Sequence, residues 1–112
     1  MTDFLTQREV AEKLGVAPTR IKQLWADNAL LKVVQDGKPM VPAKCLAKEN
    51  GRWEPLAPLR GTMFMLLDAG FSHDEATEWM LTKQDAIDAV PLDLLAENRI
   101  KEVRNAILPF AF

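Results

Sequence analysis

Two short amphipathic segments separated by only three residues constrain the fold of this chain more than any other feature of its sequence. A helix is predicted over residues 7–14. Thr6 and Glu9 have the spacing of a capping box at its start, and Gly15 supplies a left-handed residue at its end. A second helix is predicted to begin at Pro18, because proline suits the first helical position. Two helices joined this closely match a helix-turn-helix in length and in turn chemistry.

The second predicted helix, residues 18–28, has two contrasting faces. Ile21, Leu24 and Trp25 follow the spacing of a single helical face, so we expect them to point inward. The opposite face is polar or basic, and its residues are Thr19, Arg20, Lys22 and Gln23. This polar face is the strongest candidate for contact with a ligand.

A β-hairpin is predicted directly after the second helix. Asp36-Gly37 lies between two short segments of β-branched and apolar residues, and this dipeptide is among the strongest local signals for a two-residue hairpin turn. Pro39 weakens the second strand, because proline has no N–H to donate to a neighbouring strand. A hairpin in this place would form the wing of a winged helix-turn-helix.

Between the hairpin and the C-terminal half, the sequence predicts a short helix and a connector. Pro42 is expected to open the helix, which covers residues 43–48 and ends at Asn50-Gly51. Residues 51–58 contain two prolines and show no hydrophobic period, so we interpret them as a connector.

The C-terminal half is predicted to be a string of short helices. Ser72 and Glu75 form a second capping box, Pro91 suits a helix start, and Pro109 suits a helix end. The predicted helical segments cover residues 59–69, 73–81, 86–89, 92–97 and 99–107.

These elements predict a mainly α protein. A winged helix-turn-helix unit with a small β-hairpin wing is expected over residues 1–50, and it is expected to pack, beyond the connector at 51–58, against a helical bundle over residues 59–112. A length of 112 residues, with 48% hydrophobic and 27% charged residues, fits one domain or two very small units.

The sequence gives no signal for membrane insertion, secretion or disulfide formation. No run of 18 apolar residues exists, and the N-terminus lacks the apolar stretch of a secretory signal. The single cysteine, Cys45, can form no internal disulfide, which fits a reducing compartment. We therefore expect a cytoplasmic protein that contacts no membrane.

Positive charge is concentrated in one stretch of the chain. The net charge of −2 argues against a protein that coats nucleic acid indiscriminately. Residues 1–57 carry nine Lys or Arg against seven Asp or Glu, whereas residues 58–112 carry five against nine. Within residues 17–48 the count is six basic side chains against two acidic ones.

A basic helix in this position has the chemistry to bind double-stranded DNA in its major groove. Arginine can pair with guanine and glutamine with adenine, lysine suits phosphate, and threonine suits either a phosphate or a thymine methyl group. The predicted DNA-binding residues are Thr19, Arg20, Lys22 and Gln23 on the helix, with Lys32 and Lys38 in or beside the wing. The alternative is a merely solvated helix face. The capped first helix, the short turn and the hairpin together favour DNA binding.

The sequence also resembles known regulators. The segment LTQREVAEKLGVAPTRIKQLWADNALL resembles the winged helix-turn-helix of excisionase-like and MerR-like proteins. The whole chain is similar to a small family of actinobacterial winged helix-turn-helix DNA-binding proteins that are targets of a membrane Ser/Thr kinase. In the second half, the motifs LRGTMFMLLDAGFSHDEATEWML and VPLDLLAENRIKEVRNAI also resemble the C-terminal domain of Xre/ParS-type antitoxins.

This resemblance implies a transcriptional regulator whose DNA contacts are the same six residues. The antitoxin likeness implies a C-terminal half that binds a partner or dimerises. The kinase target of the family is a threonine in a longer N-terminal tail, and only five residues precede Thr6 here. Phosphorylation is therefore not carried over to Thr2 or Thr6.

Enzymatic activity is not expected, and neither a cofactor nor a metal is implied. His73 is the only histidine, and its neighbours in Ser72-His73-Asp74 would point in different directions on a helix. Cys45 is interpreted as a structural thiol, and the acids Asp74, Glu75 and Glu78 as ordinary residues of a first helical turn. No phosphate-binding glycine loop or metal-ligand spacing is present.

The rival hypothesis is a protein-interaction module in the acidic C-terminal half. Phe71, Trp79, Phe110 and Phe112 are more large apolar groups than a unit of this size easily buries. Trp79 is expected to belong to the core. The two terminal phenylalanines either dock on the core of their own chain or contact a second copy or a protein partner.

Overall fold

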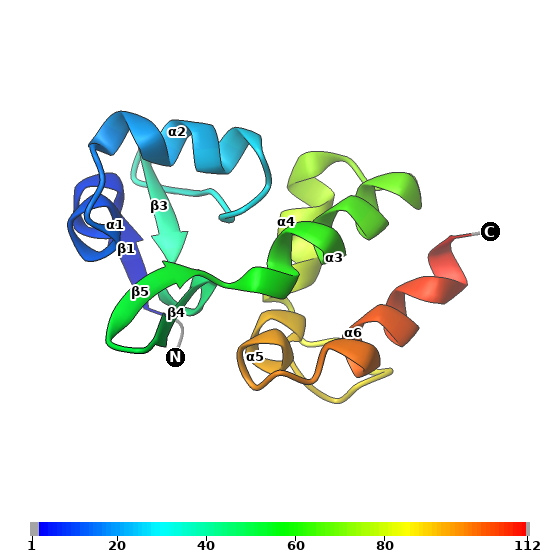
Figure 1. The fold of residues 1–112 in the computed structure, drawn as a ribbon. Helices are drawn as coiled ribbons and strands as arrows, with labels where there is room; N and C mark the ends of the chain where they lie inside the picture. Colours follow the sequence, from blue (N-terminus) through cyan, green and yellow to red (C-terminus); the bar gives the residue numbers. More distant parts are fainter. Residues whose placement is uncertain (1–2, 112) are drawn as a thin grey trace. The chain divides into compact units, whose positions relative to one another are not determined.

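A computed structural model of the chain describes residues 3–111, so Thr2 and Phe112 lie outside the described part. The chain divides into two compact units, Met1–Ala57 and Pro58–Phe112 (Figure 1). Both contain helices, whereas all five strands of the described residues lie in the first unit. The fold is thus mostly helical with two small antiparallel sheets.

The N-terminal unit combines two helices with several short strands. Its elements are β1 (Phe4–Thr6), α1 (Gln7–Leu14), α2 (Pro18–Ala26), β2 (Val33–Gln35), β3 (Lys38–Pro42), a 3-10 turn η1 (Ala43–Cys45), β4 (Leu46–Glu49) and β5 (Arg52–Pro55). The helix predicted over residues 18–28 is two residues shorter, because Asp27 caps it and Asn28 takes a positive φ of 62°.

The capping signals at both ends of α1 are confirmed. The Oγ1 atom of Thr6 accepts a hydrogen bond from the N–H of Glu9 at 3.1 Å, and the Glu9 carboxylate accepts one from the N–H of Thr6 at 2.9 Å. These bonds favour the charged carboxylate, so the pKa of Glu9 lies below its ordinary value. Gly15 ends the helix in the left-handed conformation, at a φ of 70°.

The predicted wing is present and has a third strand. Asp36 and Gly37 form the turn between β2 and β3 with φ values of 50° and 77°, as expected for the type I′ turn that suits a tight hairpin. In addition, β1 pairs antiparallel with the other side of β3, so the strand order is β1-β3-β2. The wing is therefore anchored to the residues that lead into α1.

The helix predicted over residues 43–48 and the connector over 51–58 are both wrong in part. Only Ala43–Cys45 forms a 3-10 turn, and β4 and β5 then pair as a second hairpin. Asn50-Gly51 is the turn of that hairpin, with φ values of 52° and 78°. The dipeptide that is predicted to end a helix thus forms a hairpin turn, as Asp36-Gly37 does.

A small apolar core holds the N-terminal unit together. The inward face predicted for α2 is confirmed, since Ile21, Leu24 and Trp25 are buried. They share the core with residues of the other elements, namely Val10, Ala11, Leu30, Leu31, Val41, Cys45, Leu46 and Leu56. Because α2 buries this stripe, its opposite face is left at the surface.

The C-terminal unit is helical. Its elements are α3 (Ala57–Asp68), α4 (His73–Leu81), α5 (Pro91–Ala96), α6 (Ile100–Ile107) and a 3-10 turn η2 (Leu108–Phe110). The segment predicted as helical over residues 86–89 is instead part of a turn closed by a bridge between Gln84 and Ala89. Asp88 takes a positive φ of 49° in this turn, which a continuing helix would not allow.

A second capping box begins α4, as predicted. The Ser72 Oγ atom accepts from the N–H of Glu75 at 3.1 Å, and the Glu75 carboxylate accepts from the N–H of Ser72 at 2.9 Å, which lowers the pKa of Glu75. Trp79 is buried with 8% of its surface exposed, so its predicted core position is confirmed. In the described part of the chain, no helix combines the length and apolar character needed to cross a membrane.

Candidate nucleic-acid interface

The polar face of α2 is the first component of the candidate interface. Its four predicted residues, Thr19, Arg20, Lys22 and Gln23, are all exposed. The Nη1 atom of Arg20 donates a hydrogen bond to Oε1 of Gln23 at 2.7 Å, so these two side chains do point the same way. The guanidinium keeps further donors, and the amide of Gln23 keeps its own N–H groups for other partners.

Contacts at both ends of α2 fix this face. At the start of the helix, Nε2 of Gln7 donates a hydrogen bond to the carbonyl oxygen of Pro18 at 2.7 Å and ties α1 to α2. At the end, the buried indole Nε1 of Trp25 donates to the carbonyl oxygen of Leu31 at 3.0 Å. The helix is therefore held on the core from two directions, which leaves its polar face preorganised.

The two wing lysines have different surroundings. Lys38 is exposed and begins β3, next to the turn at the wing tip. Lys32 lies just before β2, and its Nζ atom sits 5.5 Å from the ring centroid of Trp25, within the range of a cation–π contact. Lys32 thus belongs with α2 rather than with the wing tip.

The cations of this surface are available to a polyanion. The sequence of α2 contains no acidic residue. Among residues 3–111, neither Arg20, Lys22 nor Lys38 takes part in an ion pair. An approaching phosphate would therefore not have to displace a carboxylate of the same chain.

A second group of basic residues was not predicted as a site. The Nζ atoms of Lys13 and Lys48 lie 4.6 Å and 5.9 Å from the ring centroid of Trp53. These three residues, from α1, β4 and β5, are called the Trp53 cluster below. The sequence signal that could have indicated it is the turn dipeptide Asn50-Gly51, which places Lys48 and Trp53 opposite each other on paired strands.

The other chemically notable residues have structural surroundings. Cys45 is fully buried, and burial raises the pKa of its thiol to about 12, so the structural interpretation of this cysteine is supported. Ser72 uses its hydroxyl oxygen as a helix cap. The part of the chain that the structure describes brings no three His, Cys, Asp or Glu side chains together in a way that could hold a metal ion.

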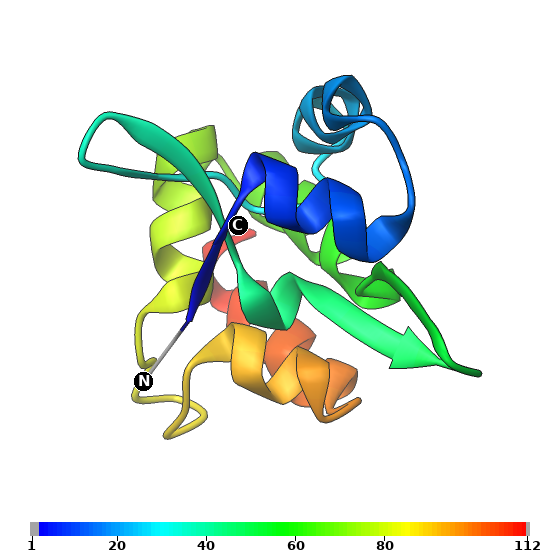
Figure 2. The same cartoon turned by 90° about the vertical axis from the view of Figure 1, so that its left-hand side faces the viewer.

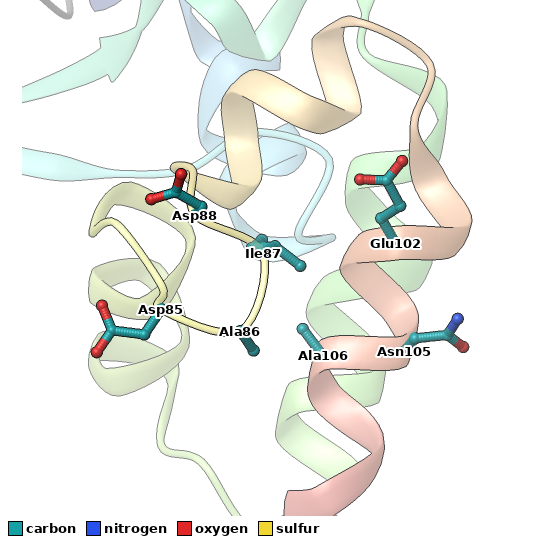
Figure 3. Close-up of a pocket in the computed structure, with 7 residues that line it drawn as sticks. All are labelled: Asp85, Ala86, Ile87, Asp88, Glu102, Asn105 and Ala106. Atoms are coloured by element: carbon teal, nitrogen blue, oxygen red, sulfur yellow. The ribbon is translucent and has the colours of Figure 1, made fainter.

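The C-terminal unit has an open groove of about 550 Å³ between the α4–α5 loop and α6 (Figure 3). Asp85 and Asp88 lie on the loop side, and Glu102 and Asn105 lie on α6. Two of the carboxylates already have partners, since Lys83 contacts Asp88 at 3.0 Å and Arg99 contacts Glu102 at 2.7 Å.

Exposed apolar side chains also occur in this unit. Phe110 is 47% exposed and makes an edge contact with Phe71, with ring centroids 5.4 Å apart. Phe110 therefore docks partly on its own unit, while Phe112 lies outside the described residues. Binding of a second copy or of a protein partner by this half stays a prediction.

Family models match both units. Residues 2–46 match the model described as "DNA-binding protein Rv2175c, wHTH domain", and residues 56–106 match "Rv2175c C-terminal domain of unknown function". The chain belongs to the Rv2175c family. Its N-terminal unit is the winged helix-turn-helix domain of a family of DNA-binding proteins, and the predicted winged helix-turn-helix is confirmed.

A solved structure has the same fold as this chain. The chain superposes on a structure titled "NMR structure of Rv2175c" with a TM-score of 0.81, at 22% sequence identity, over 98% of this chain and 82% of the other. At this identity the likeness shows the fold. No match was found among curated proteins.

Proposed function

We propose that this member of the Rv2175c family is a transcriptional regulator that inserts α2 into the major groove of double-stranded DNA. In this proposal Arg20 and Gln23 contact base edges, Thr19 and Lys22 contact the backbone at the same helix, and Lys32 and Lys38 add phosphate contacts beside it. The protein acts without catalysis and without a cofactor.

One observation carries the proposal: α2 exposes a basic face without any acidic residue, on the second helix of a winged helix-turn-helix. The major groove is wide enough to admit a helix, and its negative flanks attract the arginine and lysine side chains. The hydrogen bond between Arg20 and Gln23 holds both side chains in one direction, which reduces the conformational entropy lost on binding.

The proposal is tested by removing two cations from this face. The variant Arg20→Ala/Lys22→Ala is expected to lose measurable binding to a fluorescein-labelled duplex of mixed sequence, followed by fluorescence anisotropy at low salt. The wild-type protein is expected to bind with a slope of log K against log[salt] of about −4 to −5, as for four to six phosphate contacts.

The matched control is Lys101→Ala/Arg104→Ala, which removes one lysine and one arginine from exposed positions of α6. Both variants should keep the wild-type circular dichroism spectrum, because all four side chains lie at the surface. Equal affinities of the two variants for the duplex would contradict the proposal.

A further inference from the structure

The Trp53 cluster combines two lysines with a half-buried aromatic ring. Lys13 comes from the last turn of α1, Lys48 from β4, and Trp53 from β5. Both ammonium groups lie within 6 Å of the ring centroid, where the negative face of the indole attracts them. The ring is thus a common contact for both lysine side chains.

The strand register separates the charges of the β4–β5 hairpin onto two faces. Lys48 pairs with Trp53, so their side chains lie on one face. Glu49 pairs with Arg52, and Ala47 with Glu54, on the other face. Both glutamates of the hairpin therefore point away from the Trp53 cluster, and the face toward α1 carries only positive charge.

The position of this hairpin within the N-terminal unit suits an extended DNA contact. Figure 2 shows the wing and the β4–β5 hairpin reaching toward opposite sides of the unit, while α2 (lighter blue) lies at the top of the view, above α1. Lys13 precedes the turn into α2 by only two residues. Lys13 therefore lies near the N-terminal end of α2, and it joins the Trp53 cluster to the helix that a duplex would contact.

We propose that Lys13, Lys48 and Trp53 form a second contact with the DNA backbone, beyond the N-terminal end of α2. The two ammonium groups bind phosphate oxygens of the flanking strand, and Trp53 positions both lysine side chains. This inference rests on the proposed function. Lys48 and Trp53 lie between the two segments that match the family models, whereas Lys13 lies within the first of them.

The test compares two faces of one hairpin. Lys48→Gln removes a charge from the Trp53 cluster, whereas Arg52→Gln removes one from the opposite, exposed face. Each lost phosphate contact should reduce the magnitude of the salt slope by about 0.9 and weaken binding at 0.1 M salt by roughly 5- to 10-fold. We expect this change for Lys48→Gln and twice the slope change for Lys13→Gln/Lys48→Gln, with Arg52→Gln close to wild type.

Substitutions of Trp53 distinguish a role in positioning the two lysines from a role in folding. Trp53→Phe keeps an aromatic face and should retain most of the affinity, whereas Trp53→Leu should weaken binding by several-fold at an unchanged circular dichroism spectrum. If the wild-type protein binds no duplex at all, both proposals are overturned. If Arg20→Ala/Lys22→Ala loses binding but Lys13→Gln/Lys48→Gln has the same slope as Arg52→Gln, only the second contact is overturned.

Discussion

The two units differ in whether their exposed basic side chains are paired with carboxylates. In the N-terminal unit Arg8 pairs with Glu12, but the cations of α2 and Lys38 at the start of β3 have no carboxylate partner among the described residues. In the C-terminal unit, Lys83 pairs with Asp88 and Arg99 pairs with Glu102, and these contacts raise the pKa of both cations. A polyanion therefore finds available charge on the first unit, whereas the second unit, with nine acidic and five basic residues, repels it.

The largest expected difference between the units concerns their two buried tryptophans. Trp25 and Trp79 are each 8% exposed, but Nε1 of Trp25 donates to the carbonyl oxygen of Leu31, while Nε1 of Trp79 has no partner among the described residues. Replacing each by phenylalanine removes similar volume. Trp25→Phe also leaves a buried carbonyl unpaired, so it should lower the free energy of unfolding by about 1–3 kcal/mol more than Trp79→Phe.

Urea denaturation followed by far-ultraviolet circular dichroism measures this difference. Trp25→Leu serves as a further control, because it removes both the ring and the hydrogen bond and should be the least stable of the three variants. A larger loss for Trp79→Phe than for Trp25→Phe would show that the indole hydrogen bond is not what distinguishes the two cores.

A smaller effect is expected at the two capping boxes, where the units are alike. The hydrogen-bond distances at Thr6–Glu9 and Ser72–Glu75 are the same, 3.1 Å to the hydroxyl and 2.9 Å to the carboxylate. Thr6→Ala and Ser72→Ala should therefore each lower the free energy of unfolding by about 1 kcal/mol. Thermal melts of both variants check this. Losses that differ by more than twofold would mean that one box is supported by its surroundings.

Motifs of neighbouring residues predict the helix caps and the first hairpin turn. They do not predict structure that depends on contacts between residues far apart in the sequence. The caps of α1 and α4 and the turn at Asp36-Gly37 depend on residues close in sequence, so they could be predicted. The strand β1 could not, because three residues gain a strand conformation only by pairing with β3 more than thirty positions away. The helix predicted over residues 86–89 is absent because a helical spacing in only four residues carries little information.

The same contrast between neighbouring and distant residues applies to the candidate site. Three-residue spacing on a helix was enough to predict that Arg20 and Gln23 point the same way. The Trp53 cluster needed the tertiary structure, because it joins α1 to a hairpin that begins more than thirty residues later. Asn50-Gly51 is the sequence signal for this hairpin. The same dipeptide is also compatible with the end of a helix that begins after Pro42, so the sequence alone does not decide between the two.

The most direct test of DNA binding by α2 is an NMR titration of the ¹⁵N-labelled protein with a DNA duplex of mixed sequence at low salt. We expect the amide signals of α2 and those around Lys38 to shift or broaden, while signals of residues 58–111 change little. Shifts confined to residues 58–111, or no shift of any α2 amide at saturating duplex, would contradict the claim that the exposed face of α2 binds DNA.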